Sequence, residues 1–542
     1  MAKSALDCEV LVVGAGPTGL MAANLLKRNG IDVRLVEQRP EQTRESRAFA
    51  VQARTLELMQ SIGLAARFLA RGMAVDSVNM HFQGKFRGGL NFAHVRAPDT
   101  PYPYIFMIPQ SETEAILTED IEKLGVKVER GVAVDRIEQD ATGVTTTVTT
   151  PAGQAKIRSA YIVGGDGSRS IVRSETGIGW EGDMVPQRFL LADCKVDWEF
   201  SHDKFRVFHN GALTGLFLPL DGSRLSRVMA TDLSENAVGD AENARPAPLE
   251  LEEMQAGFAK AIGVPVKLSN PEWLTRYRAH HRIAGQYRSG RAFIAGDAAH
   301  IHSPAGGQGM NTGLQDAANL AWKLAAVLRG SGSESLLDSY DAERRPLGEA
   351  VVKSTGKLFA AAAGQAGWIA ALRDRMASLA LPVISKLPPF HNKVFNKLSQ
   401  RGIVYPRSAF VGGTDGKVKP GGRVPNAPLT GGKAVFDLIK GYRFHILVFS
   451  NAALDAAQSQ ALASISASRE VEVHQIDSAG QNAEAFERFG VAPDEQVTLV
   501  VRPDGYVAWR GQGVLPGEAA ALVESLAAKP RPARKTRRSR AA

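Results

Sequence analysis

The sequence predicts a protein of the α/β and α+β classes, with a Rossmann-type nucleotide-binding domain, an inserted antiparallel sheet and a further C-terminal domain. Three glycine-bearing segments, at residues 14–19, 164–173 and 296–311, each follow a short apolar run that is typical of a buried strand. Four strand-like runs lie between residues 189 and 231 and predict the inserted sheet. At 542 residues the chain is too long for one hydrophobic core.

The first glycine segment, Gly14-x-Gly16-x-x-Gly19, follows the apolar run Cys8–Val13 and precedes an apolar helix. Its first glycine permits a tight turn, its second lets the backbone approach a pyrophosphate, and its third lets helix and strand pack closely. The phosphate would lie at the helix N-terminus, where unpaired N–H groups favour an anion. A second strand ends at Glu37, whose carboxylate can accept hydrogen bonds from an unphosphorylated ribose. The segment therefore predicts FAD or NAD binding.

The third glycine segment predicts the place of a flat cofactor ring. The apolar run Arg291–Ala295 leads to Asp297, which can bind a ribitol or ribose hydroxyl. Small and rigid residues from Ser303 to Asn311 allow a ring to lie against the main chain. The positive N-terminus of the helix that follows would stabilise negative charge on a reduced flavin, so we expect FAD. His300 and His302 are expected to be structural rather than catalytic.

These motifs resemble those of the single-component FAD-dependent aromatic hydroxylases, the para-hydroxybenzoate hydroxylase class, and within it the phenol and pentachlorophenol monooxygenase subgroup. The resemblance runs from about Cys8 to about Leu347 and continues more loosely beyond. It identifies residues 164–173 with the Asp-Gly motif that supports FAD and nicotinamide binding in the family. The cofactor-binding residues expected from the motifs and the resemblance together are Gly14, Gly16, Pro17, Thr18, Gly19, Glu37, Gln38, Arg47, Gln110, Asp166, Gly167, Arg173, Gly296, Asp297, Pro304, Gly307, Gly309, Met310 and Asn311.

The resemblance implies hydroxylation of an aromatic, phenolic substrate with O₂ and with NADPH or NADH, through a flavin C4a-hydroperoxide. Pro304 matches the family proline beside the reactive C4a edge of the flavin. One alternative is a monooxygenase of the same fold that hydroxylates, epoxidises or inserts oxygen by the Baeyer–Villiger reaction into a polycyclic polyketide. Another is a non-catalytic flavin-binding partner protein, which the intact stretch from Pro304 to Asn311 disfavours.

A phenol also needs a base or a hydrogen-bond donor near its oxygen. Tyr277 and His281 precede the third glycine segment and are the candidate catalytic residues on the substrate side, together with Pro304 on the flavin side. His209 is a weaker candidate. The alternative is that Tyr277 and His281 are ordinary half-buried strand residues.

The expected domain organisation is discontinuous. Residues 1–80, 104–180 and 283–350 form the FAD-binding domain, and residues 81–103 and 181–282 form the substrate domain. A helical connector over 351–404, with a break at Pro382, leads to a third domain over 405–528 and a disordered basic tail over 529–542. The strand and helix order of the third domain resembles that of thioredoxin-like domains, although it has no cysteine and therefore no thiol redox chemistry.

Composition restricts the remaining function classes. The two cysteines, Cys8 and Cys194, are far apart and predict neither a disulfide framework nor a metal site. Seven positive charges of the tail account for most of the net charge of +9, so a specific nucleic-acid partner is not expected. The apolar run near the N-terminus is too short for a signal peptide, and no stretch predicts a membrane span. We expect a cytoplasmic enzyme, possible as a homodimer, whose partners are a small aromatic substrate and O₂.

Overall fold

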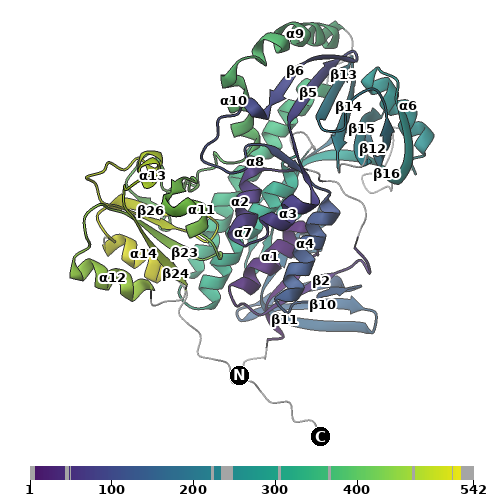
Figure 1. Ribbon diagram of the computed structural model, residues 1–542. Coiled ribbons are helices and arrows are strands. Elements are labelled where there is room, and N and C mark those ends of the chain that lie inside the picture. Colours follow the sequence, from purple (N-terminus) through teal and green to yellow (C-terminus); the bar gives the residue numbers. More distant parts are fainter. Residues whose placement is uncertain are drawn as a thin grey trace. The chain divides into compact units, whose positions relative to one another are not determined.

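The computed structural model describes residues 6–42, 48, 50–220, 225–232, 248–302, 307–363, 368–466, 470–515 and 517–526. The chain divides into two compact units. The first unit contains Met1–Lys27, Asp32–Ala317 and Arg344–Gly402, and the second contains Arg28–Ile31, Ala318–Glu343 and Ile403–Ala542. Mixed α/β architecture, as predicted, is visible in both units (Figure 1).

The first unit contains a sheet whose central strands are parallel, in the order β18-β11-β1-β2-β8. All six residues of β1 are buried, as expected where both faces of a parallel sheet are covered. The strands of this sheet are β1 (Cys8–Val13), β2 (Val33–Glu37), β8 (Val128–Arg130), β9 (Ala133–Asp140), β10 (Gly143–Thr150), β11 (Gly153–Gly164), β17 (Arg288–Ser289) and β18 (Ala292–Ile294). Because the parallel strands end at one edge, the loops after β1, β11 and β18 meet there.

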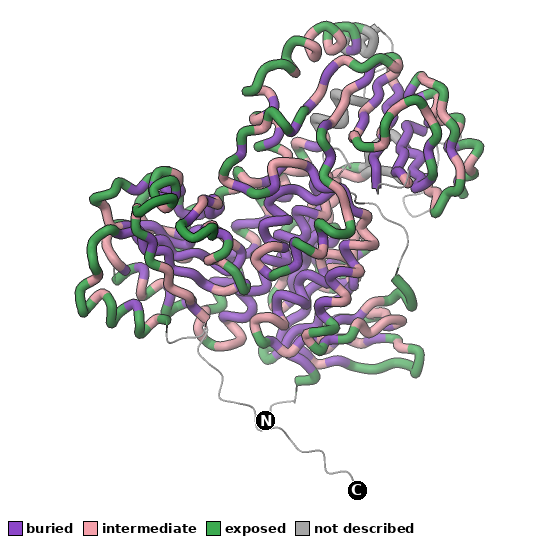
Figure 2. Tube along the Cα trace, viewed as in Figure 1, coloured by how far each residue is buried: buried purple, intermediate pink, exposed green. Residues whose placement is uncertain are grey.

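Helices cover this sheet and supply its core. Eight consecutive residues of α1, from Gly19 to Leu26, are buried, which is typical of a helix enclosed on all sides. Burial is concentrated in these inner helices and strands, whereas the far end of the β9–β10–β11 extension is exposed (Figure 2). The elements are α1 (Pro17–Arg28), α2 (Ala53–Ser61), α3 (Ala65–Arg71), α4 (Gln110–Lys123), α5 (Ile171–Glu175), α7 (Gly309–Leu328), α8 (Glu334–Ala363), the 3₁₀ turns η1 (Phe92–His94) and η3 (Gly296–Ala298), and a small sheet of β3 (Ala50–Val51), β4 (Met73–Val75) and β7 (Ile105–Met107).

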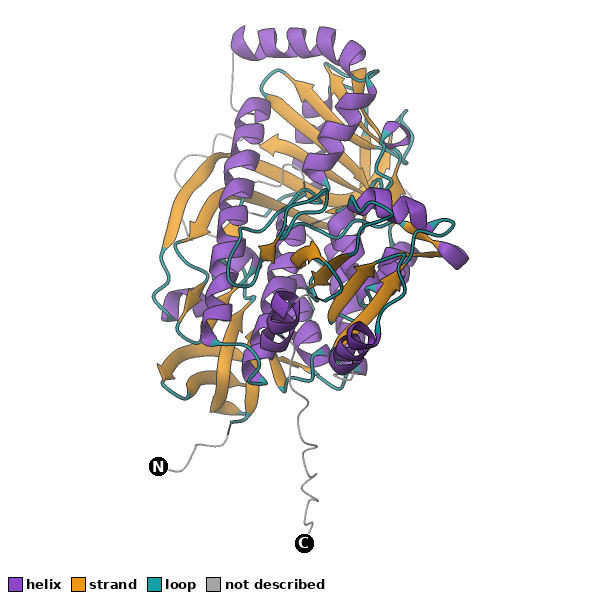
Figure 3. Ribbon diagram, turned by 90° about the vertical axis from the view of Figure 1, so that its left-hand side faces the viewer, coloured by secondary structure: helices purple, strands orange, loops and turns teal. Residues whose placement is uncertain are grey.

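A second, strongly twisted sheet of the first unit has the order β19-β16-β12-β15-β14-β13-β5-β6. All its pairs are antiparallel except β5 with β13. Helix α6 (Leu251–Ile262) packs on one face, and the helices and strands can be followed from the side in Figure 3. The strands are β5 (Ser77–Phe82), β6 (Lys85–Asn91), β12 (Trp180–Asp197), β13 (Phe205–Asn210), β14 (Leu213–Pro219), β15 (Leu225–Asp232), β16 (Lys267–Ala284) and β19 (His300–Ile301).

Two further helices of the first unit are α9 (Trp368–Ile384) and α10 (Pro388–Leu398). The predicted break at Pro382 is wrong, since α9 continues through this proline to Ile384. A proline in the last turn removes only one helical hydrogen bond, and the helix ends two residues later anyway. No helix in the described ranges is long and apolar enough to cross a bilayer.

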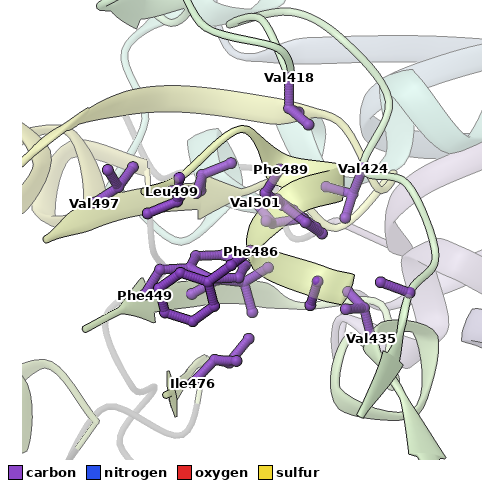
Figure 4. Packing of buried hydrophobic residues seen from close by; sticks show 14 of the residues in the cluster. Val418, Val424, Val435, Phe449, Ile476, Phe486, Phe489, Val497, Leu499 and Val501 are labelled. Atoms are coloured by element: carbon purple, nitrogen blue, oxygen red, sulfur yellow. The ribbon is translucent and has the colours of Figure 1, made fainter. Parts of the chain in front are cut away.

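The second unit is built on a five-stranded sheet in the order β20-β26-β25-β23-β24. β23 and β24 are parallel, and β25 and β26 return antiparallel, which is the element order predicted for a thioredoxin-like domain. Phe449, Phe486 and Phe489 pack together under the strands (Figure 4). The elements are β20 (Gly412–Gly413), β21 (Pro428–Leu429), η4 (Thr430–Gly432), β22 (Lys433–Ala434), α11 (Val435–Leu438), β23 (Phe444–Phe449), α12 (Ala456–Ser466), β24 (Val471–Ile476), α13 (Asn482–Phe489), β25 (Val497–Val501), β26 (Val507–Gln512) and α14 (Gly517–Leu526).

A buried ionic cluster ties the Ala318–Glu343 segment to the strands of the second unit. Glu343 accepts hydrogen bonds from Lys323 Nζ at 2.9 Å and from both terminal nitrogens of Arg502 at 2.9 Å. Arg502 also binds Asp504 at 2.6 Å. Burial opposes ionisation of Glu343, but Arg502 and Lys323 outweigh it and lower the pKa of this carboxyl to about 2. The carboxylate is therefore the centre of the cluster.

The cluster predicts an acid-sensitive second unit. An unfolded glutamate has a pKa of about 4.5, above the folded value of about 2, so this carboxylate stabilises the fold above pH 4.5. We expect up to about 3 kcal/mol of unfolding free energy to be lost as the pH falls from 4.5 toward 2. Urea unfolding at several pH values should show a steeper acid loss for the natural chain than for Glu343→Gln, with Glu518→Gln in the exposed first turn of α14 as control. Parallel pH profiles for the natural chain and Glu343→Gln would contradict this assignment.

Candidate cofactor and substrate site

The three glycine segments, which are far apart in the sequence, touch one another at the carboxyl edge of the parallel sheet. Gly14 has φ +96°, and a Cβ atom added there would lie 2.5 Å from the carbonyl oxygen of Gly165. A Cβ atom at Gly165 would lie 2.9 Å from Cα of Gly19, and one at Gly296 would lie 2.5 Å from Oγ1 of Thr18. Side chains at these positions would force the segments apart, so glycine is required for the convergence.

Gly16 has a different environment from its neighbours. A Cβ atom added at Gly16 would have no atom of the described chain within 4 Å. Directly after it, Pro17 begins α1, where a proline costs no helical hydrogen bond, and Leu20 donates the first helical hydrogen bond to the Gly16 carbonyl at 3.0 Å. The remaining N–H groups of this first turn are available to an anion. The open space and the helix N-terminus together fit a pyrophosphate.

Glu37 is held at the end of β2, as predicted. Its Oε2 accepts a hydrogen bond from the backbone N–H of Ala15 at 2.8 Å, and its Oε1 accepts one from the N–H of Arg39 at 2.9 Å. These bonds fix the carboxylate beside the first glycine segment, where its remaining lone pairs can meet a ribose. Gln38 follows and is exposed, whereas Arg47 lies outside the described residues.

Asp166 presents a buried acceptor that the described chain does not satisfy. Its Oδ2 accepts from the N–H of Val172 at 3.1 Å, while its Oδ1 is buried with no hydrogen-bond partner among the described residues. Burial raises the pKa of Asp166. A buried acceptor without a partner calls for a missing donor, and a cofactor hydroxyl or N–H fits this requirement. The adjacent Gly167, with φ +79°, turns the chain away from the site.

Arg173 connects the second glycine segment to the third. Its guanidinium donates to the carbonyl of Ala298 at 3.0 Å and to that of Ser168 at 2.8 Å, and it lies 3.9 Å from the ring of Trp180. These contacts occupy a side chain that is almost fully buried. The structure therefore gives Arg173 a positioning role, and its direct contact with a cofactor stays a prediction.

Asn311 anchors the N-terminus of α7. Its Oδ1 accepts from the N–H of Gln52, and its Nδ2 donates to the carbonyls of Ala50 and Gly307, all at 2.8 Å. Because the main chain occupies this amide, only the backbone of the segment is available to a flavin. Met310, Gly309 and Gly307 are partly exposed at the same helix end. Asp297 is exposed in the otherwise buried turn after β18, and Pro304 lies outside the described residues.

A buried ionic network lies behind the third glycine segment. Asp316 of α7 accepts at Oδ2 from the N–H of Gly296 at 3.1 Å and contacts Nε2 of His300 at 2.8 Å. Its Oδ1 accepts from Nε of Arg344 at 2.7 Å. Burial opposes ionisation, but Arg344 and His300 hold the pKa of Asp316 below its usual range. His300 is thus part of the support for the loop, consistent with the structural role that we expected.

Gln110, the first residue of α4, connects the cofactor loops to the second sheet. Its Oε1 accepts from the N–H of Ala48 at 3.2 Å, and its Nε2 donates to Glu114 at 2.9 Å. The carbonyl of Ala48 accepts in turn from Arg227 of β15 at 3.2 Å. Arg227 is fully buried and makes two hydrogen bonds of 2.7 Å to Asp193. Ala48 therefore links the cofactor side to the sheet.

The face of the second sheet that carries Arg227 is apolar, and sequence reasoning missed it. Phe189, Leu191 and Met229 form a buried cluster there, with Trp273 packed against them. Trp273 donates its indole N–H to Asp193 at 2.8 Å. The signal was present in β12, where residues 189–192 are apolar without alternation and so indicate a strand covered on both faces.

The two substrate-side candidates both lie on β16. The backbone of Tyr277 pairs with Phe189, but its side chain lies outside the described residues. His281 packs against α8, where a Cβ atom added at Gly356 would lie 3.2 Å from its ring. Burial lowers the pKa of His281, and its Nε2 is buried without a hydrogen-bond partner in the described ranges. His209, bonded to Thr214 on the distant strands β13 and β14, is not part of this region.

Comparison with known proteins agrees with this geometry. The FAD-binding domain family matches residues 7–355, and the family of aromatic-ring hydroxylase C-terminal domains matches residues 417–529. The chain belongs to the FAD-dependent aromatic monooxygenases. The predictions of family, fold class, enzyme class and FAD cofactor are confirmed, and NADPH or NADH is the usual co-substrate of such monooxygenases.

Relatives cover nearly the whole monooxygenase chain. It is 34% identical to a 6-methylpretetramide 4-monooxygenase of Streptomyces rimosus, over 93% of this chain and 91% of that protein. It is 32% identical to the pentachlorophenol 4-monooxygenase of Sphingobium chlorophenolicum, over 84% and 82% of the two chains. Among solved structures, the anhydrotetracycline hydroxylase OxyS from Streptomyces rimosus has a TM-score of 0.76 and 29% identity, and the match covers 97% of this chain and 100% of that one.

Proposed function

We propose that this monooxygenase hydroxylates a phenolic ring that binds against the face formed by Phe189, Leu191, Met229 and Trp273. The observation that carries the proposal is the continuous link from this face through Arg227 and Ala48 to Gln110. An apolar wall suits a flat aromatic molecule and keeps water from the reacting atoms. The polar groups on the wall, Asp193 and Arg227, are paired with each other.

When bound, FAD takes a hydride from NADPH or NADH and activates O₂. The chain holds it through the open Gly16 turn, the Glu37 carboxylate, the buried Oδ1 of Asp166 and the exposed Asp297. The N-terminus of α7 places a positive partial charge at the end of the third glycine segment. That charge favours an electron-rich ring system beside the main chain.

His281 is the proposed acceptor for the phenolic proton. Burial lowers its pKa, so the ring is neutral at pH 7, and its Nε2 can accept a proton from the substrate hydroxyl. A phenolate is more electron-rich than a phenol and therefore reacts more readily with an electrophilic oxygen. Tyr277 stays an alternative on the same strand, and Pro304 stays a predicted contact on the flavin side.

A second candidate is hydroxylation, epoxidation or Baeyer–Villiger oxidation of a polycyclic polyketide. It is favoured by the similarity over nine-tenths of the chain to a 6-methylpretetramide 4-monooxygenase, and by the fold shared with an anhydrotetracycline hydroxylase. A cytoplasmic location and a homodimeric state stay predictions from the sequence.

Incubation with ¹⁸O₂ and a panel of monocyclic and polycyclic phenols, followed by mass spectrometry, separates the two candidates. A monocyclic phenol that gains one ¹⁸O atom as a hydroxyl group supports the phenol proposal. A polycyclic compound that alone gains the label favours the second candidate. Nicotinamide oxidation without labelled product from any phenol would contradict both.

The proposed substrate wall predicts a binding defect in Met229→Ala. Removing this side chain should raise KM for the aromatic substrate roughly tenfold, because an apolar pocket loses about 1–3 kcal/mol per missing group of this kind. FAD content should stay unchanged. Met254→Ala is the matched control, since Met254 is equally buried but lies under α6 on the opposite face of the sheet. Equal KM values in the two variants would show that this face does not bind substrate.

A further inference from the structure

Three side chains that commonly bind metal ions converge in the second unit, away from the glycine segments. His445 lies on β23, and Glu472 and His474 lie on the neighbouring strand β24, both labelled in Figure 1. The parallel register pairs His445 with Glu472 and Leu447 with His474. Because alternate residues of a strand point to the same side, all three side chains project from one face of the sheet.

The ligand atoms form a triangle of the size that a single metal ion requires. Nδ1 of His445 lies 3.2 Å from Nε2 of His474, and these two atoms lie 3.8 Å and 3.9 Å from Oε2 of Glu472. A point in the plane of the triangle lies about 2.1 Å from all three atoms. Zinc binds imidazole nitrogen at about 2.0–2.1 Å and carboxylate oxygen at about 2.0–2.2 Å.

The charge states of the three groups also suit a cation. Burial and the neighbouring His474 and Arg443 lower the pKa of His445 to about 3, and burial lowers the pKa of His474. Both rings are thus neutral at pH 7, which is the form that binds metals. Glu472 uses Oε1 to accept from Arg443 at 2.8 Å, which leaves Oε2 directed at the imidazoles. Such support of a carboxylate ligand is typical of metal sites.

We propose that His445, Glu472 and His474 bind one divalent transition-metal ion of the zinc type. Two nitrogens and one oxygen leave a fourth tetrahedral position for water, and Glu472 and His474 are partly exposed for entry of the ion. The ion connects β24, the last strand of the sheet among the described residues, to its neighbour β23. It stabilises the unit, and the proposal is independent of the flavin chemistry.

The test is a Co²⁺ titration of the tag-free full-length protein after chelation and dialysis. One equivalent of Co²⁺ should give the visible absorption bands of a tetrahedral ion, and Zn²⁺ should displace it. His474→Gln should weaken binding at least 100-fold, and Glu472→Gln at least tenfold. His94→Gln is the control, since this exposed histidine lies outside the cluster and should leave binding unchanged. Bound FAD serves as the check that each variant is folded.

Thermal unfolding supplies a second measurement. Zn²⁺ at about 100 times its Kd should raise the folding equilibrium constant of the second unit about 100-fold in the natural chain and not in His474→Gln. Absence of stoichiometric binding, or equal affinity in His474→Gln and the natural chain, would overturn the proposal and leave only a hydrogen bond between the two imidazoles. If His474→Gln does not fold, Glu472→Gln decides by the same criteria, because its side chain is 43% exposed and its removal leaves no buried gap.

Discussion

Replacing Gly16 with valine is expected to lower the affinity for FAD about 100-fold or more, a loss of about 2.7 kcal/mol or more, while the apoprotein stays folded. The structure places no described atom within 4 Å of a Cβ at this position, so the protein itself has room for the new side chain. A pyrophosphate at the N-terminus of α1 would not have that room, because the backbone must approach it closely. The flavin absorbance after desalting, FAD titration and circular dichroism measure the two effects separately.

Two further variants complete this experiment. Gly179→Val is the matched control, since Gly179 likewise has no described atom within 4 Å of an added Cβ, and it should keep FAD. Gly14→Ala should destabilise the apoprotein as well, because Gly14 has φ +96° and an added Cβ would clash with the Gly165 carbonyl. Retention of FAD by Gly16→Val at the natural affinity would show that the pyrophosphate lies elsewhere.

Asp316→Ala is expected to destabilise the first unit by about 3–5 kcal/mol, because Arg344 would be left buried without its carboxylate partner. The same change removes the acceptor for the Gly296 N–H, so the remaining folded protein should bind FAD more weakly. Urea unfolding and FAD titration of the same variant measure the two losses.

The conservative variant separates charge from shape. Asp316→Asn keeps an acceptor for Gly296 but loses the negative charge, and its stability should lie between those of the natural chain and Asp316→Ala. The depressed pKa of Asp316 predicts that the natural chain loses this stabilisation as the pH falls below the usual range for aspartate, whereas Asp316→Asn does not. An unfolding free energy of Asp316→Ala within 1 kcal/mol of the natural value would refute this role for the network.

The cofactor side could be predicted because its determinants are local. A strand, a glycine turn and a helix follow one another in the first segment, and the physical requirement at Gly14 or Gly16 depends on a few neighbouring atoms. Parallel strands then bring the ends of β1, β11 and β18 to one edge, so three local signals add up to one site.

The side-chain roles were harder to predict because they depend on contacts between distant residues. Asn311 binds the backbone of Ala50 and Gln52, more than 250 residues away, and no local pattern encodes that contact. The pair of His445 and His474 depends on the register of two parallel strands 29 residues apart. The substrate wall shows only as apolar residues in β12, which a sequence does not distinguish from an ordinary core strand.

The most direct test of the account is anaerobic reduction of the purified protein by NADPH or NADH, followed by the flavin spectrum with and without a panel of phenols. The account predicts a yellow protein with bound FAD, whose reduction becomes many-fold faster in the presence of at least one aromatic ligand. Protein that neither contains FAD nor takes it up, or bound FAD whose reduction no aromatic ligand accelerates, would contradict an aromatic monooxygenase built on these three glycine segments.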